Sequence, residues 1–245
     1  MKSMKTLLAG VVLLASASAF ATPVNLAGGE NPNLQQVINS LYTNAGTSLA
    51  QAPNVNLNQS AEIGIFQVEA SGGSVSTMII EVAGNAGTNT FGIYDIYNPT
   101  TYLQLFSGAA SSGGQALLSV NDSFQFAVNF GTGVQFSSSL FGYYLGTANG
   151  PTFYSQASLN GGADQMVAFQ GDGDVIKLPT KPAAIWGSSS FILAWEDQPL
   201  AGSDYDYQDM VVYVESISVP EPGSLALLGL GLAGLAGAAR RKKPV

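Results

Sequence analysis

The chain between residues 60 and 219 is broken into short runs rich in Val, Ile, Phe and Tyr, with clusters of Gly, Ser, Asn and Thr between them. Runs of this length, bounded by turn residues, are typical of β-strands. Nine of them fall in fewer than 160 residues, so the pattern predicts an all-β fold, an antiparallel, jelly-roll-like β-sandwich. The expected strands are residues 62–69, 74–82, 90–97, 115–120, 123–130, 140–145, 165–169, 190–195 and 209–217.

The sequence also predicts which faces of one strand are apolar and where one long loop lies. The run at residues 123–130 alternates apolar residues with polar or small ones, which predicts a strand with one wet face and one apolar face. The apolar face consists of Phe124, Phe126, Val128 and Phe130. The stretch at residues 180–189 is expected to be a long loop within the domain rather than a domain boundary.

A helical pattern precedes the strands. Four apolar residues recur at the spacing i, i+3, i+4, i+7, which indicates one buried helix face; they are Leu34, Val37, Ile38 and Leu41. Asn31 and Pro32 stand just before them and suit the cap and first position of a helix. We therefore expect one short helix, followed by a linker, in residues 22–60, and a β-sandwich domain in residues 61–219.

The composition excludes several classes of function. Cysteine and histidine are absent, which rules out disulfides, zinc sites with nitrogen or sulfur ligands, and catalysis through imidazole or thiolate. Residues 22–219 carry two lysines against fifteen carboxylates, a net charge of −13. Because binding to nucleic acid depends on cations that neutralise phosphates, we expect no nucleic-acid partner.

The N-terminal segment has the features of a secretory signal peptide. Two lysines precede an apolar run at residues 7–14, and Ala19 and Ala21 supply the small residues that signal peptidase accepts. We expect residues 1–21 to be removed before Thr22 after passage through the general secretion machinery. A membrane anchor is the alternative, but it needs about 20 apolar residues, and serines interrupt this run.

The C-terminal segment, residues 220–245, begins with Pro220, Glu221 and Pro222. A charge-free stretch at residues 224–239 follows, and then a basic cluster. As a helix this stretch is about 24 Å long, slightly short of a hydrocarbon core of about 30 Å. It predicts a transmembrane helix of marginal length, with the basic cluster in the cytoplasm and the acidic domain outside the cytoplasmic membrane.

This order of proline-rich motif, apolar helix and basic end resembles the PEP-CTERM sorting signal of exopolysaccharide-producing Gram-negative bacteria. The resemblance implies recognition by an exosortase, cleavage near Pro220, Glu221 and Pro222, and transient anchoring in the cytoplasmic membrane before release or transfer to the cell surface. Proline restricts the backbone and lacks an N–H donor, so an extended segment is favoured just outside the membrane. A plain tail anchor is the alternative.

The densest charged segment lies between the last two expected strands. It holds five carboxylates and no lysine or arginine: Glu196, Asp197, Asp204, Asp206 and Asp209. Oxygen ligands from a loop suit calcium, which accepts six to eight of them in tolerant geometry. The spacing lacks the glycine and distal glutamate of an EF-hand. Two interpretations stay open: a calcium site, or a solvated acidic hairpin that improves solubility.

Residues 191–197 and 202–212 resemble the signature of the DUF4114 family of bacterial surface proteins. That signature is an apolar strand, Glu-Asp, a glycine-rich turn, Asp-x-Asp-aromatic-Asn-Asp and two or three valines. Residues 141–145 and 158–169 resemble the family as well. The resemblance implies a β-rich extracellular module, a candidate for calcium dependence, with no established activity.

The sequence departs from the family pattern at two positions. Gln208 stands where the family usually has Asn, which leaves the carboxylates intact but removes a shorter amide from the turn. Gln165 stands where a histidine is common.

These observations favour a non-catalytic, exported component of the cell surface or biofilm matrix. The alternative is a lectin-like module that binds exopolysaccharide with calcium, using rings near the acidic loops; the candidate rings are Tyr143, Tyr144, Tyr205, Tyr207 and Trp195. A second interpretation places these same rings in the hydrophobic core. A glycosidase using Glu196 or Asp197 with Asp204 is less favoured, because catalytic carboxylates usually come from separated strands that line a cleft.

Overall fold

The structure, a computed structural model, describes residues 24, 26, 31–60, 64–69, 73–81, 87–108, 110–147 and 150–220. All of them fall within one unit, residues Ala21–Pro220. The expected signal peptide with Ala19 and Ala21, and the expected transmembrane segment at residues 224–239, lie outside the described residues. In the described ranges, no helix has both the length and the apolar character needed to cross a bilayer.

Helix α1 (Leu34–Ala45) forms where the apolar spacing predicts it. Its N-cap is Asn33, not Asn31–Pro32. The Asn33 side chain accepts a hydrogen bond from the backbone N–H of Gln36, and the Gln36 side chain accepts one from the N–H of Asn33. This reciprocal capping box starts the helix two residues later than expected. The four residues of the predicted face are all buried: Leu34, Val37, Ile38 and Leu41.

Two antiparallel sheets make up most of the fold, which confirms the prediction of a mainly β, antiparallel structure. The larger sheet has the strand order β10 (Met166–Gln170), β13 (Ser190–Trp195), β14 (Met210–Glu215), β2 (Ser74–Glu81), β5 (Gln115–Val120), β6 (Gln125–Val128) and β7 (Val134–Gln135). The smaller sheet has the order β4 (Asn98–Phe106), β3 (Thr90–Asp95), β8 (Phe141–Gly146) and β9 (Thr152–Tyr154).

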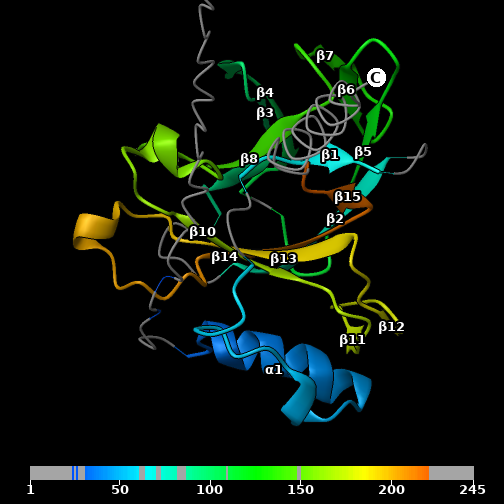
Figure 1. The fold of residues 1–245 in the computed structure, drawn as a ribbon, viewed down its shortest axis with the longest axis vertical. Helices are drawn as coiled ribbons and strands as arrows, with labels where there is room; N and C mark the ends of the chain where they lie inside the picture. Colours follow the sequence, from blue (N-terminus) through cyan, green and yellow to red (C-terminus); the bar gives the residue numbers. More distant parts are fainter. Residues whose placement is uncertain are drawn as a thin grey trace, which may run out of the picture. The chain divides into compact units, whose positions relative to one another are not determined.

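Shorter elements complete the described part of the chain. Two ladders of two strands pair β1 (Gln67–Val68) with β15 (Ile217–Ser218) and β11 (Val175–Lys177) with β12 (Ala183–Ile185). The 3₁₀ helices are η1 (Leu49–Gln51), η2 (Ala157–Asn160) and η3 (Leu200–Gly202). Figure 1 shows the smaller sheet on one side of β13 and β14, and α1 on the other.

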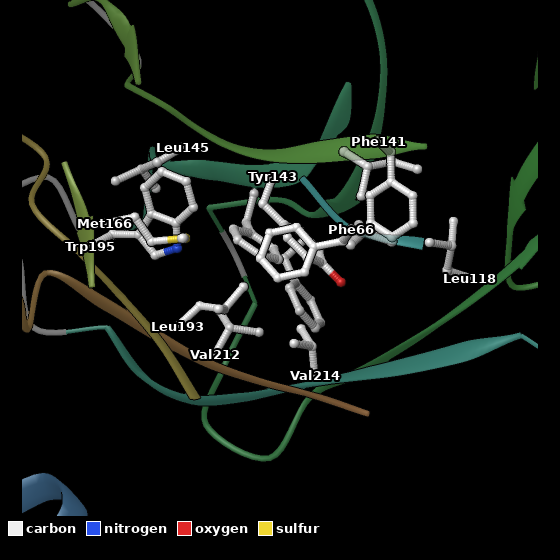
Figure 2. Packing of buried hydrophobic residues seen from close by; sticks show 14 of the residues in the cluster. Phe66, Leu118, Phe141, Tyr143, Leu145, Met166, Leu193, Trp195, Val212 and Val214 are labelled. Atoms are coloured by element: carbon white, nitrogen blue, oxygen red, sulfur yellow. The ribbon is translucent and has the colours of Figure 1, made fainter. Parts of the chain in front are cut away.

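The core between the two sheets is rich in aromatic rings. Tyr143 of β8 stacks on Phe91 of β3, with ring centroids 5.3 Å apart, and meets Phe66 edge-on at 4.9 Å. Figure 2 shows Trp195 beside Met166 at one end of this cluster. Fully burying a large apolar side chain contributes about 1.5–3 kcal/mol, so these rings account for much of the attraction between the sheets.

A second core lies between the larger sheet and α1. The β13 residues Ile192 and Ala194 point into it, whereas Leu193 and Trp195 point into the inter-sheet core. Strand β13 is therefore buried on both faces, which explains its unbroken apolar sequence.

The structure corrects the sequence interpretation at several strands. Strands β4, β7, β9, β11 and β12 are not among those predicted. The prediction of a loop at residues 180–189 is wrong for its middle part, because Ala183–Ile185 form a strand that pairs with β11. In the described part of the run at residues 62–69, only Gln67–Val68 form a strand.

The strand expected at residues 123–130 is shorter than predicted. Phe124, Asn129 and Phe130 have left-handed φ values of 61°, 49° and 61°, so they leave the pleat on both sides of β6. Phe126 is buried, but Phe130 is 84% exposed. The predicted apolar face is therefore wrong at both ends.

Candidate metal centre

The five predicted acidic residues lie on or next to the loop that joins β13 to β14. These strands are antiparallel neighbours, and Trp195 at the end of β13 pairs with Met210 at the start of β14. The chain thus leaves and re-enters the sheet at the same place. This pairing brings Glu196 and Asp209 together, although they lie at opposite ends of the loop.

Three carboxylates converge at this place. Glu196, Asp206 and Asp209 each offer an oxygen within 4.8 Å of the other two. Glu196 is 0% exposed, and neither of its carboxylate oxygens receives a hydrogen bond within the described part of the chain. A buried carboxylate without a donor is costly unless a proton or a cation compensates it.

The other two predicted acids lie around this group. Asp197 is buried and accepts a hydrogen bond from Nδ2 of Asn89 at 2.9 Å. Its backbone N–H donates to Oδ2 of Asp209 at 2.7 Å. Asp204 is exposed and does not belong to the three-acid group. The structure therefore brings together three of the five acids, and the backbone N–H of Asp197 orients one of these, Asp209.

The backbone of the loop is strained at two tyrosines. Tyr205 and Tyr207 have left-handed φ values of 59° and 52°, and such conformations cost on the order of 1–3 kcal/mol each. The buried Tyr207 hydroxyl donates to the backbone carbonyl of Asp164, which anchors the loop. The Gln208 side chain donates to Oδ2 of Asp206 at 2.8 Å and positions that carboxylate.

Two amide side chains add buried oxygens to the site, and the sequence did not suggest either as a site residue. Nε2 of Gln165 donates to the backbone carbonyls of Glu196 and Gln198, and Asn89 donates to Asp197. Gln165 Oε1 and Asn89 Oδ1 are buried, and neither has a hydrogen-bond partner in the described ranges. Both amides are thus held against residues 196–198, and each keeps one buried oxygen that accepts no hydrogen bond from the described residues.

The pKa values of the buried carboxylates also favour a cation at this loop. Burial raises the pKa of both Glu196 and Asp209 well above the ordinary range; neighbouring carboxylates raise that of Asp209 further, whereas the side chain of Asp209 counteracts part of the rise at Glu196. The other charges that act on Glu196 belong to Asp197, Asp204 and Asp206. A bound divalent cation reverses this effect, because it stabilises the ionised carboxylates.

The aromatic residues considered for sugar stacking are mostly inaccessible. Four of the five are buried: Tyr143, Tyr144, Tyr207 and Trp195. Only Tyr205 is exposed, at 37%. For these four, the interpretation as buried residues is confirmed, and the interpretation as a binding surface beside the acidic loop is wrong.

Comparison with known families matches two parts of the chain. Residues 128–217 match the domain of unknown function DUF4114, and residues 218–242 match the PEP-CTERM protein-sorting motif. The chain therefore carries a DUF4114 domain followed directly by a PEP-CTERM sorting motif, which confirms both resemblances. The domain match includes all five acidic residues. No curated protein and no solved structure matches the chain.

The sorting motif marks an exported protein that an exosortase processes and that is anchored transiently in the membrane before it reaches the surface. Pro220 is the last described residue, and Glu221 and Pro222 lie outside the described ranges. Strand β15 ends at Ser218, so the folded domain leads into the motif with almost no intervening linker.

Proposed function

We propose that this protein is a non-catalytic component of the cell surface or extracellular matrix whose β13–β14 loop is completed by a calcium ion. The observation that carries the proposal is Glu196, which is fully buried, receives no hydrogen bond on its carboxylate from the described residues and lies beside Asp206 and Asp209. Carboxylate, amide and backbone oxygens are the ligands that calcium prefers.

Export fits this proposal. Extracellular modules bind calcium with dissociation constants of about 10⁻⁴–10⁻³ M, values suited to the medium outside the cell. A loop that is completed only by calcium reaches its full stability after export. The ion then stabilises the pairing between β13 and β14, the strands buried on both faces.

The burial of the acids disfavours catalysis. The two carboxylates of a glycosidase flank a sugar and lie about 5–10 Å apart across an open cleft. Glu196 is 0% exposed, and its oxygens lie within 4.8 Å of those of Asp206 and Asp209. Carboxylates that are buried and this close together match the ligands of an ion better than the two sides of a sugar-binding cleft.

A calcium-dependent lectin is the second candidate at this loop. It depends on Tyr205, whose exposed ring lies between Asp204 and Asp206 in sequence. The burial of Tyr207 and Trp195 weighs against it, because an extended stacking surface beside the ion is then missing.

Thermal unfolding of the protein with calcium or with a chelator tests the proposal. At a hundredfold excess over the dissociation constant, calcium contributes about 2.7 kcal/mol, which raises Tm by roughly 5–10 °C in a domain of this size. The variant Asp206→Asn should lose this rise. Asp122→Asn is the matched control, since Asp122 is an exposed acid on the turn between β5 and β6. Equal melting curves with calcium and chelator would refute the site.

We also propose that the envelope of a Gram-negative bacterium is the site of processing. The sorting motif and the predicted signal peptide support this location. In cells that carry the exosortase, Glu221→Ala should leave uncleaved protein in the cytoplasmic membrane, measured by fractionation and immunoblotting. Normal cleavage of this variant would contradict the role of the motif.

A further inference from the structure

The last strand of the domain, β15, is bonded to two other segments of the chain. It pairs with β1, with Gln67 opposite Ser218 and Val68 opposite Ile217 (Figure 1). In addition, the Ile217 N–H donates a hydrogen bond to the backbone carbonyl of Ser189 at 3.1 Å. Strand β15 thus bonds both to β1 and to the residue directly before β13, so the end of the domain is a fixed part of the fold.

Side-chain contacts hold the same segment. Ile217 is 0% exposed and belongs to the core between the two sheets, and the partly buried Val219 packs against that core. Nε2 of Gln67 donates a hydrogen bond to Oγ of Ser218 at 3.2 Å. The folded domain therefore extends to Val219, the residue directly before Pro220 of the sorting motif.

Strand β1 is itself bound to the smaller sheet. Phe66, the residue before it, exchanges two backbone hydrogen bonds with Phe141 of β8, at 2.8 and 3.0 Å. The Phe66 ring is fully buried and meets Tyr143 edge-on (Figure 2). Because β1 is held in place in this way, β15 can be released only by exposing its own backbone groups and the side chain of Ile217.

This packing limits where an exosortase can cut. Cleavage breaks one peptide C–N bond: the carbonyl carbon passes to the oxygen of water, or to the nitrogen or oxygen of an acceptor. The proton that this nucleophile gives up goes to the amine, which leaves with the C-terminal fragment. An enzyme that binds an extended peptide uses its main-chain hydrogen bonds, which β15 already forms with β1 and Ser189. A bond inside β15 is therefore cut only in molecules in which the strand has opened.

We propose that exosortase cuts the chain at the bond between Val219 and Pro220 or at a later bond, so that the mature domain keeps all of β15 and Val219. The proposal rests on the processing proposed above and sets its N-terminal limit. A cut before Ile217 would remove a fully buried side chain from the core and would leave β1 without its partner strand. Cleavage beyond Val219 removes none of the described core residues and needs no opening of the domain.

The mass of the mature C-terminus is the first test. The full chain is produced in cells that carry the exosortase, and mass spectrometry of the intact product and of its C-terminal peptide identifies the last residue. We expect Val219 or a later residue. Processed protein that ends at Ser218 or earlier would overturn the proposal and leave the processing itself intact. A wild-type chain that stays uncleaved would overturn both.

Processing rates test whether β15 has to open. Ile217→Ala should raise the fraction of molecules with β15 released about tenfold or more, a change of roughly 1.4 kcal/mol. A nonspecific protease added to the purified, unprocessed variant should therefore cut within residues 215–219 about tenfold faster than in wild type. Exosortase processing, followed in cells by pulse labelling, should keep the wild-type rate. A processing rate that rises together with this opening would place the cut inside β15 and overturn the proposal.

A milder variant covers the case in which Ile217→Ala weakens the whole core. Gln67→Ala removes the side-chain hydrogen bond to Ser218 and leaves the buried residues in place, with the same expectation at a smaller size. Ile185→Ala is the matched control, since Ile185 is an isoleucine 69% exposed on β12, and it should change neither rate. A mature chain that ends before Val219 in any of these variants would contradict the proposal.

Discussion

The β13–β14 loop and the outer face of the smaller sheet differ in how far their own residues compensate the groups that they bury. The loop buries Glu196 with no hydrogen-bond donor to its carboxylate among the residues that the structure describes, and places other carboxylates next to it. Among the described residues, that sheet face is built from uncharged side chains, and its rings contact one another in pairs, Tyr94 with Tyr154 and Tyr102 with Tyr144. A region with uncompensated buried charge should respond to calcium and pH, whereas a neutral, self-supporting face should respond to neither.

The largest effect should come from Trp195, which connects the two regions. Its ring meets Phe91 of the smaller sheet edge-on at 6.1 Å, and the residue directly precedes Glu196. Trp195→Ala should cost about 3–5 kcal/mol in the free energy of unfolding, because it leaves a large cavity between the sheets. Denaturant titration measures the loss, and calcium binding should weaken with it. A cost below about 1 kcal/mol would show that the connection is unimportant.

The stability of the calcium-free protein should fall as pH rises. The pKa values of Glu196 and Asp209 are raised in the folded state to about 7 and about 9. Their protonated forms therefore favour folding, and this contribution is lost from about pH 4 upward through the raised values. We expect a loss of about 2–4 kcal/mol over this range, measured by thermal unfolding in chelator. Saturating calcium should flatten the profile, and a calcium-free profile that rises with pH would contradict the account.

Replacing the buried acid itself should have an effect of opposite sign. Glu196→Gln removes a buried carboxylate whose ionisation burial disfavours, so at pH 8 the calcium-free variant should be more stable than wild type by about 2 kcal/mol. The same variant should lose the calcium response. Asp122→Asn, which changes an exposed acid, should alter neither quantity. If Glu196→Gln destabilises the calcium-free protein, the carboxylate has a compensating partner and the argument for a cation fails.

The sheet face should show a smaller effect that is insensitive to calcium. Gly142→Ala places a methyl group against the ring of Tyr94 and should cost about 1–2 kcal/mol through overpacking. Gly187→Ala is a suitable control, because a Cβ there meets no atom within 4 Å. Equal stability of the two variants would show that the ring does not need glycine beneath it.

The sequence predicted those parts of the fold that depend on local periodicity. The spacing of Leu34, Val37, Ile38 and Leu41 was enough to predict α1. The continuous apolar run at residues 191–195 was enough to predict β13. Strand β4 was missed because it begins with Asn98 and Pro99 and continues through threonines, a composition typical of turns. The ends of β6 were misjudged because left-handed backbone at Phe124 and Phe130 has no signature in these side chains.

The candidate site was predictable to a similar degree. The proximity of Glu196 and Asp209 follows from the pairing of β13 with β14, since each residue flanks a paired strand end. Asn89 was not predictable, because it lies 108 residues from its partner Asp197 and reaches it only through the packing of the two sheets. The burial of Tyr207 and Trp195 likewise depends on tertiary packing.

Calorimetric titration of the protein with calcium, with magnesium as the comparison, measures whether the β13–β14 loop binds an ion. We expect saturable calcium binding that Asp206→Asn abolishes, and weaker binding of magnesium, which demands stricter octahedral geometry. Absence of binding heat together with unchanged stability, or equal calcium binding by Asp206→Asn, would contradict this expectation and leave the loop as a solvated acidic hairpin.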